Sequence, residues 1–150
     1  MIPDVSIDVL LYIFLTGVFF LLGIQKDAVR IVAAILSACV VLLLWLTFPV
    51  SAFIKNTIPQ MLLFLIILVL LYAAFMKVRL FGEFQRQLVP VLFLSPLAAG
   101  LLLSGFVSLM PVHELLKLSP LGSVIFGGFY ALFAWVVASV GGIVIFSQTK

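Results

Sequence analysis

Few residues in this 150-residue sequence can do acid–base or metal chemistry, and only one pair of them stands out. His113 is the only histidine, and Glu114 follows it directly. A zinc site built on this pair would need at least one more ligand at a known spacing. The sequence also lacks the HExxH, GxSxG, GxGxxG and Walker motifs. We therefore expect a non-enzyme without cofactor or metal, in which His113 and Glu114 are solvated loop residues.

The composition points to lipid as the solvent of this chain. Hydrophobic residues make up 66% of the sequence and charged residues only 9%, whereas soluble proteins carry charge at about a quarter of their positions. Such a chain cannot cover itself with polar surface. Its net charge of +3 comes from eight scattered basic residues against five acids. This charge is too dispersed for a nucleic-acid-binding stripe.

Five continuous apolar segments approach or exceed the length of about 17–25 residues that a helix needs to cross a bilayer. They cover residues 9–24, 31–48, 58–76, 88–110 and 121–146. None has the two-residue alternation of a transmembrane β-barrel strand. The predicted fold is all-α, a polytopic bundle of about five transmembrane helices that forms a single integral membrane domain over residues 1–150. The first segment is the shortest, and it can either span the bilayer or re-enter it.

The basic residues of the connecting loops predict the orientation. If the segments alternate in direction, one side of the membrane holds Lys26, Arg30, Lys77, Arg79, Arg86 and Lys150, and the other holds Lys55 and Lys117. By the positive-inside rule the richer side is cytoplasmic. We expect a protein of the bacterial inner (plasma) membrane with its N-terminus outside and its C-terminus in the cytoplasm. No Asp, Glu, Lys, Arg or His lies inside the five segments, which disfavours a proton-coupled or ion-coupled transporter.

Pro96 lies deep in the fourth segment, where its missing N–H predicts a helix kink. The kink can expose backbone carbonyls to a substrate. Alternatively it can pack against neighbouring helices, with the hydroxyl of Ser95 bonded to the backbone. We favour the second interpretation, because no charged or amide side chain stands near Pro96.

Small residues recur along the fifth segment at helical spacing. Ala131, Ala134, Ala138 and Gly142 form the longest such row, and small residues on one helix face allow a second backbone to approach closely in lipid. This predicted helix-packing face can serve packing within the chain, or it can receive a membrane-protein partner or a second copy of the chain.

The first forty residues resemble the opening of the bacterial colicin V production protein family. The resemblance is carried by Asp8 before the first apolar stretch, Gly23 and Lys26 at its end, and Arg30 at the start of the second helix. Asp27 stands where the family has a second glycine, and the fifth segment extends the usual four. The residues themselves predict that Gly23 ends the first helix. Lys26 and Arg30 are expected to hold the turn at the cytoplasmic headgroups.

Two functional hypotheses follow. The resemblance implies a non-enzymatic inner-membrane protein linked to colicin export and envelope maintenance, with no residue that can be named as an active site. Such a protein would act through partners, with the lipid bilayer around it. The alternative is a small-molecule carrier or the membrane subunit of a transporter, with its substrate between the kinked fourth helix and the neighbouring helices.

Overall fold

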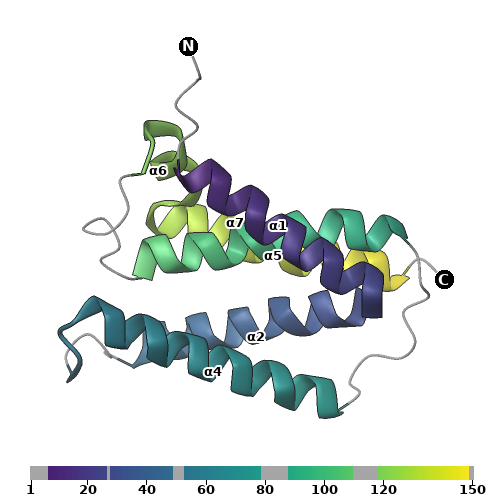
Figure 1. Cartoon of the computed structure of the whole chain (residues 1–150), viewed down its shortest axis with the longest axis horizontal. Helices are drawn as coiled ribbons and strands as arrows, with labels where there is room; N and C mark the ends of the chain where they lie inside the picture. Colours follow the sequence, from purple (N-terminus) through teal and green to yellow (C-terminus); the bar gives the residue numbers. More distant parts are fainter. Residues whose placement is uncertain (1–6, 27, 49–52, 79–87, 110–117, 149–150) are drawn as a thin grey trace.

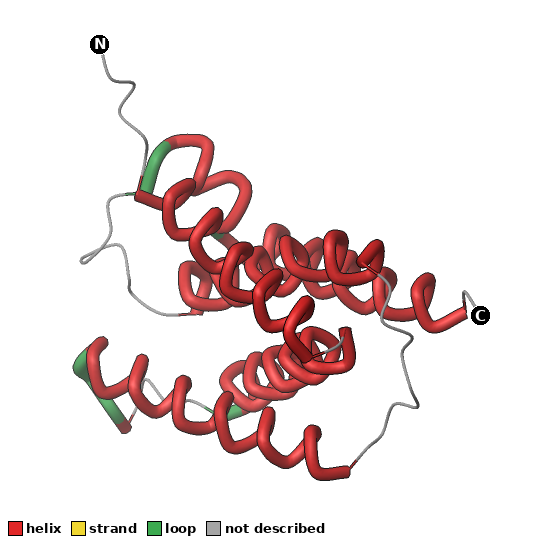
Figure 2. Tube along the Cα trace, turned by 45° about the vertical axis from the view of Figure 1, so that its right-hand side comes forward, coloured by secondary structure: helices red, strands yellow, loops and turns green. Residues whose placement is uncertain are grey.

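The computed structural model describes residues 7–26, 28–48, 53–78, 88–109 and 118–148. These residues form α1 (Ile7–Lys26), α2 (Ala28–Thr47), α4 (Thr57–Val78), α5 (Leu88–Leu109), α6 (Pro120–Phe126) and α7 (Gly128–Gln148). All of these elements except α6 are long and apolar enough to cross a membrane. The described part of the chain contains helices and loops but no strand (Figure 2). The predicted all-α bundle of about five transmembrane helices is confirmed.

The spanning helices alternate in direction, so α1, α4 and α7 begin at the end of the bundle where α2 and α5 finish (Figure 1). The short helix α6 also lies at this end, which we call the α6 end. Helix α5 packs against α1, α2 and α7, whereas α4 packs mainly against α2. Helix α5 is therefore the centre of the bundle and α4 is its most peripheral span.

Small residues of α5 explain its central position. A Cβ atom on Gly100 would overlap the indole of Trp135 in α7, and one on Gly105 would lie 2.6 Å from the side chain of Leu42 in α2. A Cβ atom on Gly23 of α1 would likewise lie 2.5 Å from the side chain of Val91 in α5. Lipid supplies no hydrophobic drive for helix association, so this close packing must hold the spans together.

Helix α4 is attached by a narrow seam. Among its residues with described burial, only Gln60 and Phe64 are buried. The ring of Phe64 lies 5.6 Å from that of Trp45 in α2 and 4.8 Å from that of Phe106 in α5. The amide of Gln60 donates a hydrogen bond to the carbonyl of Ile54, which satisfies a polar group near the helix start. Partly buried side chains such as Leu63, Ile67 and Leu71 extend this contact with the core, and the exposed face of α4 is available to lipid.

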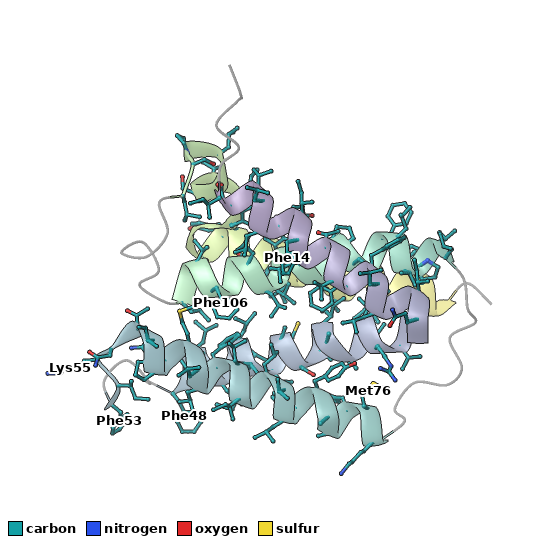
Figure 3. The ribbon with its side chains drawn as sticks, in the orientation of Figure 1. Phe14, Phe48, Phe53, Lys55, Met76 and Phe106 are labelled. Carbon is teal, nitrogen blue, oxygen red and sulfur yellow. The ribbon has the colours of Figure 1, made fainter. Side chains whose placement is uncertain are left out.

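Large apolar side chains are exposed on every spanning helix, as Figure 3 illustrates for Phe14 on α1. Further examples are Leu43 on α2, Ile66 on α4, Phe93 on α5 and Phe133 on α7, each more than half exposed. A water-soluble surface would not carry so much apolar area on all sides. The exterior is that of a protein surrounded by lipid.

The predicted fifth segment differs from the structure, because residues 121–146 do not form one helix. Helix α6 ends at Phe126, and α7 begins at Gly128, whose φ of 85° is incompatible with a continuous right-handed helix. The first helix also begins earlier than the predicted segment and includes Asp8. Helix α5 stays helical on both sides of Pro96.

The contact between Gly100 and Trp135 predicts a strong dependence of stability on residue size. Gly100→Val should lower the free energy of unfolding by about 1–3 kcal/mol, since the added side chain would displace an indole that is held by the carbonyl of Ile125 and the ring of Phe126. Gly141→Val is the matched control, because a Cβ there meets nothing within 4 Å. Thermal unfolding of the purified protein in detergent compares the two. Equal melting temperatures for both variants would contradict the packing described for α5.

Candidate functional site

Polar contacts between the helices gather in three places. One joins the start of α1 to the start of α6, the second surrounds the break between α6 and α7, and the third lies around Pro96 in α5. In each contact a hydroxyl group or an indole N–H donates a hydrogen bond to an oxygen atom of another helix or helix end. This is how polar groups are satisfied where no water is present.

The first place is a junction built on Asp8, which is only 2% exposed in the first turn of α1. The hydroxyl of Ser119 donates a hydrogen bond to Asp8 Oδ2 at 2.6 Å and accepts one from the backbone N–H of Gly122 at 2.9 Å. Ser119 is also the N-cap of α6. A carboxylate at this depth needs such a charge-assisted partner to offset its lost hydration. The junction ties α1 to α6.

Gly122 is part of this junction because of its size. A Cβ atom at this position would overlap the carboxylate of Asp8. Any larger residue would push Asp8 away from Ser119. The resemblance of the N-terminal hairpin identified Asp8 as a residue of interest. It did not identify Ser119, which bonds to Asp8, or Gly122, which bonds to Ser119; they stand 111 and 114 positions further along the chain than Asp8.

The second place is the break between α6 and α7, where backbone carbonyls accept hydrogen bonds from side chains. The indole N–H of Trp135 donates to the carbonyl of Ile125 at 2.9 Å. The hydroxyl of Ser104 donates to the carbonyl of Phe126 at 3.0 Å. Ser108 lies within bonding distance of two carbonyls, those of Phe126 at 3.3 Å and Gly128 at 3.1 Å. Side chains of α5 and α7 thus replace the helical bonds that are lost at the break.

Aromatic rings cover this break on the side of α1. The indole of Trp135 stacks on the ring of Phe126 with a centroid distance of 5.9 Å and an interplanar angle of 10°. Tyr12 of α1 lies 5.4 Å from Phe126 and 6.2 Å from Trp135. The three rings pack α6 against α1 and α7.

The third place surrounds Pro96. The hydroxyl of Ser95 donates to the carbonyl of Val91 at 2.6 Å, which is the back-bonding that we favoured from the sequence. Tyr12 donates to the carbonyl of Pro96 and Ser139 to the carbonyl of Leu97, both at 3.3 Å. Three α5 carbonyls near the proline therefore already have side-chain donors.

The turn residues lie at the opposite end of the bundle from the Asp8 junction. Helix α1 continues to Lys26, so the expectation that Gly23 ends it is wrong. Gly23 instead lets α1 approach Val91 of α5. Arg30 lies in the first turn of α2 and is half-buried. Asp27 falls outside the described residues.

The predicted packing face on α7 divides in two. Gly142 packs against Leu97 and Leu94 of α5, and Ala131 is half-buried. Ala134 and Ala138 are exposed. The side of α7 that meets the bundle instead carries Leu132, Trp135 and Ser139.

The predicted loop pair His113 and Glu114 lies outside the described residues, as does most of the connection from Arg79 to Leu88. Among the residues that are described, no group of three or more histidine, cysteine, aspartate or glutamate side chains is placed to hold a metal ion. The arrangement that the described residues present is a set of hydrogen bonds between helices, which satisfies their polar groups.

Comparisons with protein-family models, with curated proteins and with solved structures find no match to this chain. The resemblance of its first forty residues to the colicin V production protein family stays a prediction.

The Asp8 junction makes a testable contribution to stability. Ser119→Ala removes both the donor to the carboxylate and the cap of α6, and should cost about 1–3 kcal/mol in the free energy of unfolding. Ser123→Ala is the control, since that exposed hydroxyl bonds only locally, to the carbonyl of Pro120. Thermal unfolding in detergent measures both variants. If Ser119→Ala has the same melting temperature as the wild type, the junction contributes nothing to the stability of the fold.

Proposed function

We propose that this chain is a non-enzymatic protein of the bacterial inner membrane that acts through a protein partner, as a factor in export or envelope maintenance. The resemblance to the colicin V production protein family suggests that the process is export or envelope maintenance. The multispan helical fold and its lipid-facing exterior are consistent with it. The partner-dependent part of the proposal rests on one observation, the outward face of α7.

That face combines small residues with open space. Ala134 and Ala138 are exposed, and a Cβ atom on Gly141 would meet nothing within 4 Å. Small residues that point into the bundle allow packing within the chain, but these three are not needed for it. In lipid, such a face lets the helix of another protein approach closely enough for van der Waals contact. Its position supports the partner hypothesis over packing within the chain.

The charges at the two ends support an orientation. Lys26, Arg30 and Lys77 lie at the end opposite α6, whereas Lys55 lies at the α6 end; Figure 3 labels Lys55 at one end and Met76, next to Lys77, at the other. The positive-inside rule then puts the α6 end outside and the end of α7 in the cytoplasm. In this orientation the Asp8 junction faces the outer side of the membrane.

A small-molecule carrier is the second candidate, and the break between α6 and α7 favours it. Carriers commonly place substrates and ions at interrupted helices. The hydrogen bonds at both places give this candidate less support. Side chains already donate to the carbonyls of Val91, Pro96 and Leu97. The carbonyls of Ile125 and Phe126 at the break also accept hydrogen bonds from side chains. The two candidates differ in what should be bound to the purified chain.

In-cell crosslinking, purification in mild detergent and mass spectrometry test the partner hypothesis. We expect a recurrent membrane protein bound to the wild type, and a loss of about tenfold or more with Ala138→Leu, because the added bulk separates the helices. Ala73→Leu makes the same change on the exposed surface of α4 and should leave the complex intact.

Two outcomes would contradict this proposal. An undiminished complex with Ala138→Leu would exclude the α7 face as the contact. Recovery of the chain alone with a specific small molecule would favour the carrier.

A further inference from the structure

The short helix α6 turns apolar side chains away from the bundle. Leu121 and Val124 are 73% and 75% exposed, and Ile125 is 48% exposed. Val124 and Ile125 follow Leu121 by three and four residues, so the three side chains share one face of the helix, which we call the apolar side of α6. The face that meets the bundle is a different one and carries Gly122 and Phe126. The apolar side needs an apolar environment, because its exposure to water is unfavourable.

The hydroxyl groups of α6 lie on another side of the helix. Ser123 follows the N-cap Ser119 by four residues, so the two share a face. At 3.6 residues per turn, Ser123 projects about 160° away from Leu121 around the helix axis. The hydroxyl of Ser123 is exposed and donates to the carbonyl of Pro120. Helix α6 thus has one side on the bundle, one apolar side and one polar side, which suits the boundary between lipid and water.

The contacts of α6 place it level with the outermost turns of the bundle (Figure 1). Its start is bonded to Asp8 through Ser119, and its last residue, Phe126, packs against Tyr12. Asp8 and Tyr12 both lie in the first two turns of α1. The four residues between them rise by about 6 Å, whereas the seven residues of α6 measure about 10 Å, so α6 crosses α1 obliquely. Helix α7 is long enough to cross the membrane without α6.

We propose that α6 is an interfacial helix, and that its apolar side inserts into the phospholipid leaflet at the α6 end. The start of α7 supports lipid as the occupant, because Phe129 and Phe133 are more than half exposed there and continue the lipid-facing surface of the spans up to α6. Tyr130 is 90% exposed between them, and tyrosine is enriched at the level of the headgroups. Helix α6 has no charged residue, so its surface fits acyl chains better than a charged protein partner.

Insertion of α6 holds the Asp8 junction at the membrane surface. The hydrogen bond between Ser119 and Asp8 connects α6 to α1, and the bond from Trp135 to the carbonyl of Ile125 connects it to α7. The depth of α6 in the leaflet therefore sets the depth at which α1 and α7 begin. This inference does not depend on the partner proposed above, because the face proposed for that partner lies on α7 and consists of other residues.

Spin-label accessibility tests this insertion, with the full chain in vesicles of phosphatidylethanolamine and phosphatidylglycerol. Val124→Cys and its neighbour Ser123→Cys are introduced separately into a Cys39→Ala background, and each is labelled with a nitroxide. Oxygen concentrates among the acyl chains, whereas a nickel chelate stays in water. The ratio of oxygen to nickel collision rates should be higher for Val124→Cys than for Ser123→Cys by about threefold or more. Leu70→Cys on the exposed side of α4 is the lipid reference, and Lys55→Cys is the water reference.

Val124 and Ser123 are both exposed, so the labels do not disturb the packing of the bundle. Free access of the nickel chelate to both labels would overturn the insertion, because α6 would then lie in water. Equal shielding of both labels from nickel, with oxygen reaching both, would place α6 inside the hydrocarbon core and overturn its interfacial position. Shielding of Val124→Cys from oxygen and nickel alike would mean that a protein covers the apolar side, and would overturn lipid as its occupant.

Discussion

The structure depends on one constraint, that backbone polar groups inside a bilayer must find partners within the protein. A continuous helix meets this constraint by itself, but the break at Gly127 and Gly128 does not. Trp135 from α7 and two serines from α5 supply the missing donors. These hydrogen bonds hold the end of α6 against α5 and α7, and the Asp8 junction holds the start of α6 against α1. In the described part of the chain, the polar contacts between helices lie at the Asp8 junction, at the break after α6 and around Pro96 in α5, and the other contacts between the helices are mainly apolar.

The packing of α5 follows from the same solvent. Because lipid tails are as apolar as the side chains, helices associate only where they fit closely. Gly100 and Gly105 provide this fit on α5, with Trp135 on one side and Leu42 on the other. Helix α4 packs mainly against α2 and meets α5 through the rings of Phe64 and Phe106, so it stays peripheral. The bundle thus has a tightly packed centre and a loosely attached edge.

The sequence predicted the spans well because length and hydropathy determine them, but it did not predict which faces meet. Helix α7 is apolar on all sides, so hydropathy could not show that Ala134 and Ala138 point outward while Leu132 points inward. The partner of Asp8 was missed because Ser119 is remote in sequence. The break after α6 was signalled only by Gly127 and Gly128, since the residues around them are as apolar as a continuous span.

Side-specific cysteine labelling tests most directly that this chain crosses the bilayer with its α6 end outside. Lys55→Cys and Lys77→Cys, both exposed positions, are introduced separately into a Cys39→Ala background and treated with a membrane-impermeant maleimide in intact cells whose outer membrane is permeable to the reagent. The account predicts that Lys55→Cys reacts at once and that Lys77→Cys reacts only after the inner membrane is opened. Labelling of both positions from the same side would contradict the bundle, and the reverse pattern would contradict its orientation.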